Sequence, residues 1–363
     1  DMIKQYTEIL HRAIRYHQDG HLQEAEACYL KAASHSTTKA IAIGNLASLY
    51  KAQGHLERAE ALFNEAIRLN PLNASVLHNY AGLLCSLGRY QDAKAREEQA
   101  IEYEPNNAEL HTRLGFSQWK LGELDAAIVA CRRAIELNSS NTTALLNLGG
   151  IYRDRQQLEL ALELTLRAIH IDPQCCDAQE NAGVILQQLG RSADALQPLS
   201  KAQQLEPSRA SVYLHLARSM EQLGQLDQAE SLSRQAITLN PGNGDAYTLL
   251  SFLMFERNRI GDAIELAEHA IKLNPDDVQA LSNLSSYLRA KNRLPEALAV
   301  ARQALELQPD SSAAHCVLGS LLQSTAQFAE AKQAFEAAIA CPQPSCSAFF
   351  QLSNQATSDQ VQE

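Results

Sequence analysis

Residues 40–73 read AIAIGNLASLYKAQGHLERAEALFNEAIRLNPLN and hold two helical patterns on either side of a glycine. The first pattern spaces its apolar residues as one face of an α-helix does, at Ile43, Leu46, Ala47 and Tyr50. The second pattern follows Gly54 and has apolar residues at Leu56, Ala59, Leu62, Phe63, Ala66, Ile67 and Leu69. It ends at Asn70-Pro71, because the residue before a proline is driven out of the helical region. The stretch therefore predicts a pair of helices joined by a tight turn.

The same pattern returns along the chain with a period of 34 residues. Two columns of alanine keep this step through ten units, from Ala25 to Ala331 and from Ala32 to Ala338. Small residues at fixed positions let neighbouring helices approach to about 8–10 Å. The unit ends are marked by prolines that keep the step or a multiple of it: Pro71, Pro105, Pro173, Pro207, Pro241, Pro275 and Pro309. This period is typical of stacked helical hairpins that each contact only their neighbours, so we expect one continuous array.

The turn between the two helices of a unit favours a residue that tolerates positive φ. Glycine holds this position in six units, at Gly20, Gly54, Gly88, Gly122, Gly190 and Gly224. Asn258 and Asn292 hold it in two later units, and asparagine is the next most tolerant residue.

The unit resembles the tetratricopeptide repeat (TPR), which has characteristic Leu-Gly, Tyr, turn Gly, Ala, aromatic, Ala and Pro positions. Unit two carries them as Asn45-Leu46-Ala47, Tyr50, Gly54, Ala59, Phe63, Ala66 and Pro71. The resemblance implies an all-α fold, a right-handed superhelical α-solenoid of stacked antiparallel helix pairs with the first helix of each unit on the concave side. The array domain is expected over residues 1–345, and the resemblance covers ten units in it, at 6–39, 40–73, 74–107, 108–141, 142–175, 176–209, 210–243, 244–277, 278–311 and 312–345. We expect residues 346–363 to be a truncated eleventh unit or the junction to a downstream domain.

Charge and hydropathy argue against two classes of partner. The chain has 31 Lys and Arg against 42 Asp and Glu, a net charge of −11, so a phosphate backbone would meet repulsion with no basic stripe to offset it. The longest apolar runs, such as 252–255, fall far short of the ~20 residues that cross a bilayer. We therefore expect neither nucleic acid nor a membrane as partner.

The sequence contains no recognisable catalytic motif. It lacks a phosphate-binding loop, a dinucleotide fingerprint, His-Glu-x-x-His and Gly-x-Ser-x-Gly. His17 and His21 are spaced like metal ligands on a helix, but Gly20 lies between them and no third ligand is near. The eight cysteines are scattered without Cys-x-x-Cys, which indicates reduced thiols in the cytoplasm. We expect no catalytic residue, cofactor or metal in this chain, which is therefore not an enzyme by itself.

Position six of the first helix points into the groove in TPR proteins. Here it holds Asn45, Asn79, Arg113, Asn147, Asn181, His215, Leu249, Asn283 and Val317. An amide offers a donor and an acceptor, so this column could pair with the peptide groups of an extended segment without reading its sequence. The arrangement is similar to the asparagine ladder in the TPR region of O-GlcNAc transferases. The alternative is that hydration and hydrogen bonds between helices favour asparagine at this position.

Aromatic residues at positions nine and twelve also commonly face the groove. They are Phe116 and Trp119 in unit four and Phe252 and Phe255 in unit eight. Such side chains can anchor a partner residue or pack against the next layer. Arg113 and Arg153 lie near Trp119 and could hold an acidic group of a partner, or they could simply be solvated.

The carboxylate clamp of chaperone-binding TPR proteins is matched only in part. Asn79 and Arg113 fit it. However, Gly44 and Ser48 stand where the clamp needs lysine and asparagine, and Glu109 replaces its second lysine with the opposite charge. The sequence therefore argues against this clamp.

Unit six departs from the repeat pattern. Gln179 and Ala182 replace larger apolar residues, Gln203 stands in the isoleucine column, and Pro198 falls inside the second helix. A proline there removes one hydrogen bond and kinks or loosens the helix. We expect this layer to be the softest, through ordinary sequence drift or as a functional hinge.

The resemblance implies a cytoplasmic scaffold or adaptor that binds protein or peptide segments in its groove. A second hypothesis is that the chain is the substrate-recognition arm of a larger bacterial transferase, a sulfotransferase or glycosyltransferase, whose catalytic domain lies downstream. The third is self-association through the terminal repeats, since end layers without a polar cap expose apolar surface.

Overall fold

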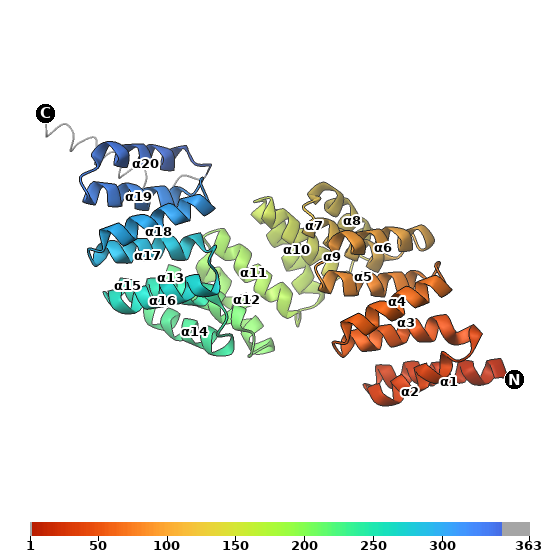
Figure 1. Cartoon of the computed structure of the whole chain (residues 1–363). Coiled ribbons are helices and arrows are strands. Elements are labelled where there is room, and N and C mark those ends of the chain that lie inside the picture. Colours follow the sequence, from red (N-terminus) through yellow and green to blue (C-terminus); the bar gives the residue numbers. More distant parts are fainter. Residues whose placement is uncertain (1, 343–363) are drawn as a thin grey trace. The chain divides into compact units, whose positions relative to one another are not determined.

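The computed structural model describes residues 2–342, and this part of the chain is built from helices and short turns without a strand (Figure 1). The predicted all-α class is confirmed. The contacts divide the chain into two compact units, Asp1–Ala178 and Gln179–Glu363, where the sequence predicted one continuous array. The division falls in the first helix of predicted unit six, at the position where Gln179 replaces an apolar residue.

The helices of the first unit are α1 (Met2–Gln18), α2 (Leu22–Ala32), α3 (Ser36–Ala52), α4 (Leu56–Leu69), α5 (Ala74–Ser86), α6 (Tyr90–Tyr103), α7 (Ala108–Lys120), α8 (Leu124–Leu137), α9 (Thr142–Asp154) and α10 (Leu158–Ile171). They are followed by α11 (Cys176–Gln188), α12 (Ser192–Leu205), α13 (Ala210–Gln222), α14 (Leu226–Leu239), α15 (Gly244–Glu256), α16 (Ile260–Leu273), α17 (Val278–Ala290), α18 (Leu294–Leu307), α19 (Ser312–Ser324) and α20 (Phe328–Ala340). The eleventh unit expected over residues 346–363 lies outside the described residues.

Consecutive helices pair, and the pairs stack within each unit (Figure 1). In the first unit the first helices of successive pairs also touch, α3 with α5, α5 with α7 and α7 with α9. The second helices of this unit make no comparable contact with one another over the described residues. The first helices α3, α5, α7 and α9 therefore form one shared surface, which we term the first-helix face.

The turns inside the pairs adopt positive φ as the sequence predicts. All six turn glycines do so, with φ between 72° at Gly190 and 81° at Gly54, and Asn258 and Asn292 follow at 59° and 58°. Gln156 and Ala326 take the same conformation, φ 60° and 59°, although nothing in their side chains favours it. The two packed helices on either side impose this turn whatever residue fills it.

Polar caps start most of the first helices. The capping side chains that accept a backbone N–H are His35, Asn73, Asn107, Asn141, Asn243, Asp277 and Ser311. They satisfy donors that a helix start otherwise leaves unpaired. The asparagine or aspartate shortly after a repeat proline thus marks where the next unit begins.

In the core of each layer, a small residue of the first helix packs against one residue of the second helix, which we term the central residue. The central column, one residue per layer, is buried throughout and reads Tyr29, Phe63, Glu97, Cys131, Thr165, Leu199, Ser233, Ala267, Ala301 and Phe335. A Cβ on Gly183 would lie 2.4 Å from Leu199 Cγ, and one on Gly319 would lie 2.5 Å from Phe335 Cε1. In these two layers a Cβ on the first helix would collide with the bulky central residue, so glycine fits there without a rearrangement.

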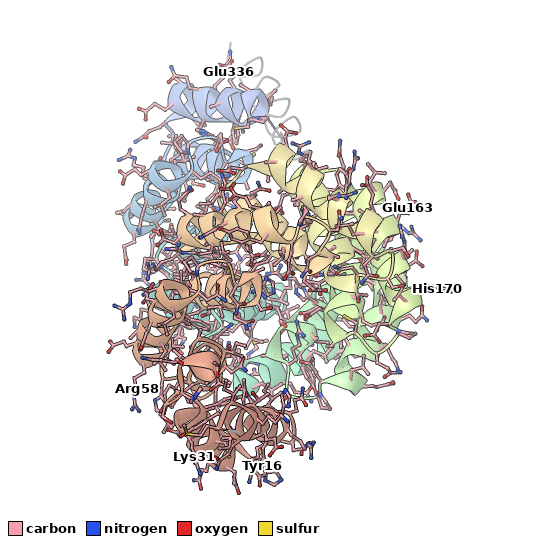
Figure 2. All side chains as sticks on the ribbon, turned by 90° about the vertical axis from the view of Figure 1, so that its right-hand side faces the viewer. Tyr16, Lys31, Arg58, Glu163, His170 and Glu336 are labelled. Carbon is pink, nitrogen blue, oxygen red and sulfur yellow. The ribbon has the colours of Figure 1, made fainter. Side chains whose placement is uncertain are left out.

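The outward side of the second helices is polar. Glu163 and His170 project from α10 into solvent and are exposed (Figure 2). In the second unit, α12 runs unbroken from Ser192 to Leu205 with Pro198 buried inside it. The expected softness of this layer stays a prediction.

Candidate functional site

The first-helix face of the first unit carries seven of the residues singled out in the sequence: Asn45 on α3, Asn79 on α5, Arg113, Phe116 and Trp119 on α7, and Asn147 and Arg153 on α9. All except Asn147 are partly exposed. Since α3, α5, α7 and α9 touch in succession, these side chains belong to neighbouring layers of a single surface.

The asparagines on this face differ in whether their side-chain amides form hydrogen bonds within the protein. Asn147 is 9% exposed, and its Nδ2 lies 3.5 Å from the carbonyl oxygen of Thr112 on the preceding first helix. This contact is a hydrogen bond between helices, which is the alternative role that the sequence suggested for these asparagines. The amides of Asn45 and Asn79 are partly exposed and form no hydrogen bond with any of residues 2–342. Among the asparagines of α3, α5, α7 and α9, these two have both donor and acceptor unused by residues 2–342.

Trp119 connects two neighbouring layers. Its ring lies over Gly150 of α9, where an added Cβ would sit 2.3 Å from Cη2. The indole Nε1 donates to Asp154 Oδ2 at 2.7 Å, and Lys120 Nζ lies 4.8 Å from the ring centroid. Phe116 meets Trp119 edge-on at 6.3 Å between centroids. These contacts hold the ring against α9 while leaving part of it exposed, and its role as an anchor stays a prediction.

The remaining predicted residues lie in the second unit. They are Asn181 on α11, Phe252 and Phe255 on α15 and Asn283 on α17. Both phenylalanines pack against the buried core, and Phe255 stacks on Tyr287 with 4.6 Å between centroids. Asn283 Oδ1 accepts a hydrogen bond from Gln279 Nε2 at 2.9 Å. Asn181 is partly exposed. Packing between layers, the alternative given for the phenylalanines, accounts for their contacts here.

Lys51 and Arg113 converge on the first-helix face, and of these two only Arg113 was predicted from the sequence. A Cβ on Gly82 of α5 would lie 2.9 Å from Lys51 Nζ of α3 and 2.9 Å from Arg113 Nη1 of α7. Lys51 was not predicted, although it stands at position twelve, the same repeat position as Trp119 and Arg153. That shared position is the signal that would have revealed it.

Arg113 also contacts a buried carboxylate. Glu97 of α6 is fully buried, its Oε1 lies 2.9 Å from His78 Nδ1 and 3.2 Å from Arg113 Nε, and its Oε2 has no hydrogen-bond partner within residues 2–342. Arg113 Nη2 approaches His78 Nε2 at 3.3 Å. A guanidinium only donates, so this Nε2 accepts and the ring proton sits on Nδ1, from which it is donated to Glu97. His78 thus connects Glu97 to Arg113.

The buried position of Glu97 predicts an unusual pH dependence of stability. Burial raises the pKa of this carboxyl above its ordinary value of 4.5, against the lowering effect of His78 and Arg113. A raised pKa means that the folded protein holds the proton more tightly than the unfolded chain does. Protonated Glu97 therefore stabilises the fold at low pH. This contribution is lost as the pH rises through the pKa that Glu97 has in the folded protein.

We expect the free energy of unfolding of Glu97→Gln to exceed that of the wild type increasingly as pH rises from about 4.5 to neutral. Urea unfolding followed by circular dichroism over this range measures the difference. Glu163→Gln, on the exposed side of α10, is the matched control and should track the wild type. Parallel profiles for wild type and Glu97→Gln would contradict the assignment.

The described residues give little support for a metal site, a reactive cysteine or a membrane span. Residues 2–342 contain no group of three or more His, Cys, Asp or Glu that could hold a metal ion. The cysteines in this range are free thiols, and burial raises the pKa of Cys131 to about 12, which keeps its thiol protonated at neutral pH. No helix in the same range is long and apolar enough to span a bilayer.

Known proteins point to one family. Profiles described as tetratricopeptide repeat match residues 52–114 and 108–141, and a profile described as the C-terminal domain of cilia and flagella-associated protein 70 matches residues 208–348. No curated protein matches the chain.

Solved structures of repeat proteins share the fold. The APC/C hetero-tetramer Cut9-Hcn1 is similar with a TM-score of 0.64 and 17% identity, over 96% of this chain and 76% of that one. A tetratricopeptide repeat protein from Parabacteroides merdae ATCC 43184 gives 0.57 and 19%, over 69% and 98%. Yeast Tom70 gives 0.53 and 15%, over 100% and 98%. Together with the paired helices, the turn residues and the alanine columns, these matches identify the chain as a tetratricopeptide repeat protein.

Proposed function

We propose that this chain is a protein-interaction scaffold whose first unit binds an extended peptide segment along the first-helix face. One observation carries the proposal: Asn45 and Asn79, on the touching helices α3 and α5, present amides that no residue of 2–342 uses. Each amide can donate to a peptide carbonyl and accept from a peptide N–H.

The spacing of these helices suits an extended chain. Packed helices lie about 8–10 Å apart, and an extended strand rises about 3.3 Å per residue. Asn45 and Asn79 would therefore engage peptide groups about three residues apart. Hydrogen bonds to a peptide backbone tolerate many peptide sequences. The two amides therefore contribute affinity, and other side chains of the first-helix face contribute selectivity.

Replacing both asparagines should weaken peptide binding. Two hydrogen bonds of about 0.5–1.5 kcal/mol each predict a loss of roughly tenfold or more for Asn45→Ala/Asn79→Ala. Dodecapeptides selected on the wild-type chain from a displayed random library are the probe, and fluorescence anisotropy measures their Kd.

The matched control is Asn283→Ala, the same residue at the same repeat position in the second unit, where Gln279 already occupies its oxygen. It should bind the selected peptides as the wild type does. Unchanged affinity in the double variant would overturn the proposed mode of binding.

A further inference from the structure

Lys51 and Arg113 bring two positive charges together on the first-helix face. Lys51 Nζ and Arg113 Nη1 each lie 2.9 Å from the point that a Cβ on Gly82 would occupy, so the two nitrogens are no more than twice that distance apart. The side chains reach this point from α3 and α7, and their ends fill the space that the missing side chain of Gly82 leaves. Like charges this close repel each other, and water screens them only in part because Lys51 is half-buried.

No carboxylate of the described chain compensates the charge of Lys51. Its ammonium group forms no hydrogen bond or ion pair with any of residues 2–342. Glu97, the acid that contacts Arg113, pairs with that guanidinium instead. Burial and then the charge of Arg113 lower the pKa of Lys51, against a smaller opposing effect of Cys85. A larger fraction of this amine is therefore unprotonated at neutral pH than in an ordinary lysine.

The amine of Lys51 is also accessible to a reagent. Its Nζ makes no hydrogen bond within residues 2–342 and is not one of the buried polar atoms there, so it keeps contact with solvent. A group added to Nζ has room on the solvent side, because the place over Gly82 is already filled. An unprotonated lysine beside a fixed cation is an activated nucleophile. The guanidinium of Arg113 also attracts an anionic reagent and stabilises an anionic leaving group.

We propose that Lys51 is a modification site, acylated at Nζ by acyl phosphates. The unprotonated amine attacks the carbonyl carbon of the donor, and a nitrogen–carbon bond forms. The carbon–oxygen bond to phosphate breaks, the phosphate leaves with the electron pair, and the proton lost by the nitrogen passes to water. The product is a neutral amide, which removes one positive charge from the first-helix face and ends the repulsion with Arg113. Acylation of Lys51 does not require peptide binding, so it stands apart from the proposed function.

Acetyl phosphate is the probe that tests this site in the intact chain. We expect Lys51 to be acetylated severalfold faster at neutral pH than Lys31, although Lys31 is exposed on α2 (Figure 2). Mass spectrometry of proteolytic peptides after a short reaction measures the rates of all lysines in one sample. A Lys51 that reacts no faster than Lys31 overturns the proposal.

Lys94 is the matched reference for burial. It is half-buried like Lys51, but its Nζ lies 2.7 Å from Glu123 Oε2, and the hydrogen bond to Glu123 raises its pKa. The rate of each lysine follows its unprotonated fraction and levels off once the pH exceeds its pKa. We therefore expect the rate of Lys51 to level off at a lower pH than that of Lys94, which a difference in accessibility alone would not produce. Coincident pH profiles for the two lysines would contradict the proposal.

Arg113→Gln removes the neighbouring cation and tests whether it activates Lys51. We expect the rate of Lys51 relative to that of Lys31 to fall severalfold in this variant. Arg153→Gln removes a guanidinium from α9, where it lies beside Asp154, and should leave the ratio unchanged.

The contact of Arg113 with Glu97 makes a check of folding necessary. Circular dichroism and an unchanged rate of Lys94 show that Arg113→Gln is folded. An unchanged ratio of Lys51 to Lys31 in the folded variant would overturn the proposal. If Arg113→Gln does not fold, the order of rates in the wild-type chain decides.

Discussion

Phe63→Ala should lower the free energy of unfolding by about 3–5 kcal/mol, the usual cost of emptying a buried aromatic site. Phe63 is fully buried at the centre of its layer and stacks on Tyr80 of the next layer with 5.5 Å between ring centroids. Its removal leaves a cavity between α4 and α5 that the packed helices cannot fill. Urea unfolding followed by circular dichroism measures the loss.

The damage should also be local. Each layer of a repeat array contacts only its neighbours, so amide hydrogen exchange should accelerate most in α3, α4 and α5. Leu72→Ala serves as the control, because this side chain is 63% exposed and its removal should cost less than about 0.5 kcal/mol. Equal losses in the two variants would contradict the assignment of Phe63 to the core.

The second large effect concerns Gly183 and Leu199. Leu199→Ala should cost about 2–5 kcal/mol, since Leu199 is fully buried. Gly183→Ala should cost about 1–3 kcal/mol, because its Cβ would come within 2.4 Å of Leu199 Cγ. In the double variant the new methyl group occupies space that the leucine has left. The combined loss should therefore be smaller than the sum of the single losses.

A double-mutant cycle in urea measures this coupling, which we expect to be between about 0.5 and 3 kcal/mol. The Ser285–Ala301 layer shows that two small residues can fill this site, since both are buried. Pairing Gly183→Ala with Leu239→Ala, an exposed leucine of α14, is the control and should be additive. Additivity in the Gly183–Leu199 cycle would mean that the two positions do not compensate for each other.

Periodicity and turn chemistry predicted most of the fold. Local residue preferences determine where a helix stops, and Asn70-Pro71 and Gly54 act within a few residues of themselves. The exceptions are instructive. Gln156 and Ala326 adopt the left-handed turn without any local preference for it, because the flanking helix pair requires it. The division of contacts at Ala178 was likewise not predicted from the repeat pattern.

The candidate site was predictable only in outline. A repeat position places Asn45, Asn79 and Arg113 on equivalent helices of successive layers, and these helices touch. It does not show whether an amide is already bonded, as that of Asn147 is, or unused by residues 2–342, as that of Asn79 is, because the answer depends on a neighbour one repeat away.

By itself, the sequence determined the helix pairs, their turns and the small-residue columns, because each of these follows from preferences acting over a few residues and repeated at a constant step. Only the tertiary structure brought Lys51 and Arg113 together over Gly82 and placed Glu97 against Arg113. These groups come from four helices, and side chains so far apart in sequence meet only when the layers pack.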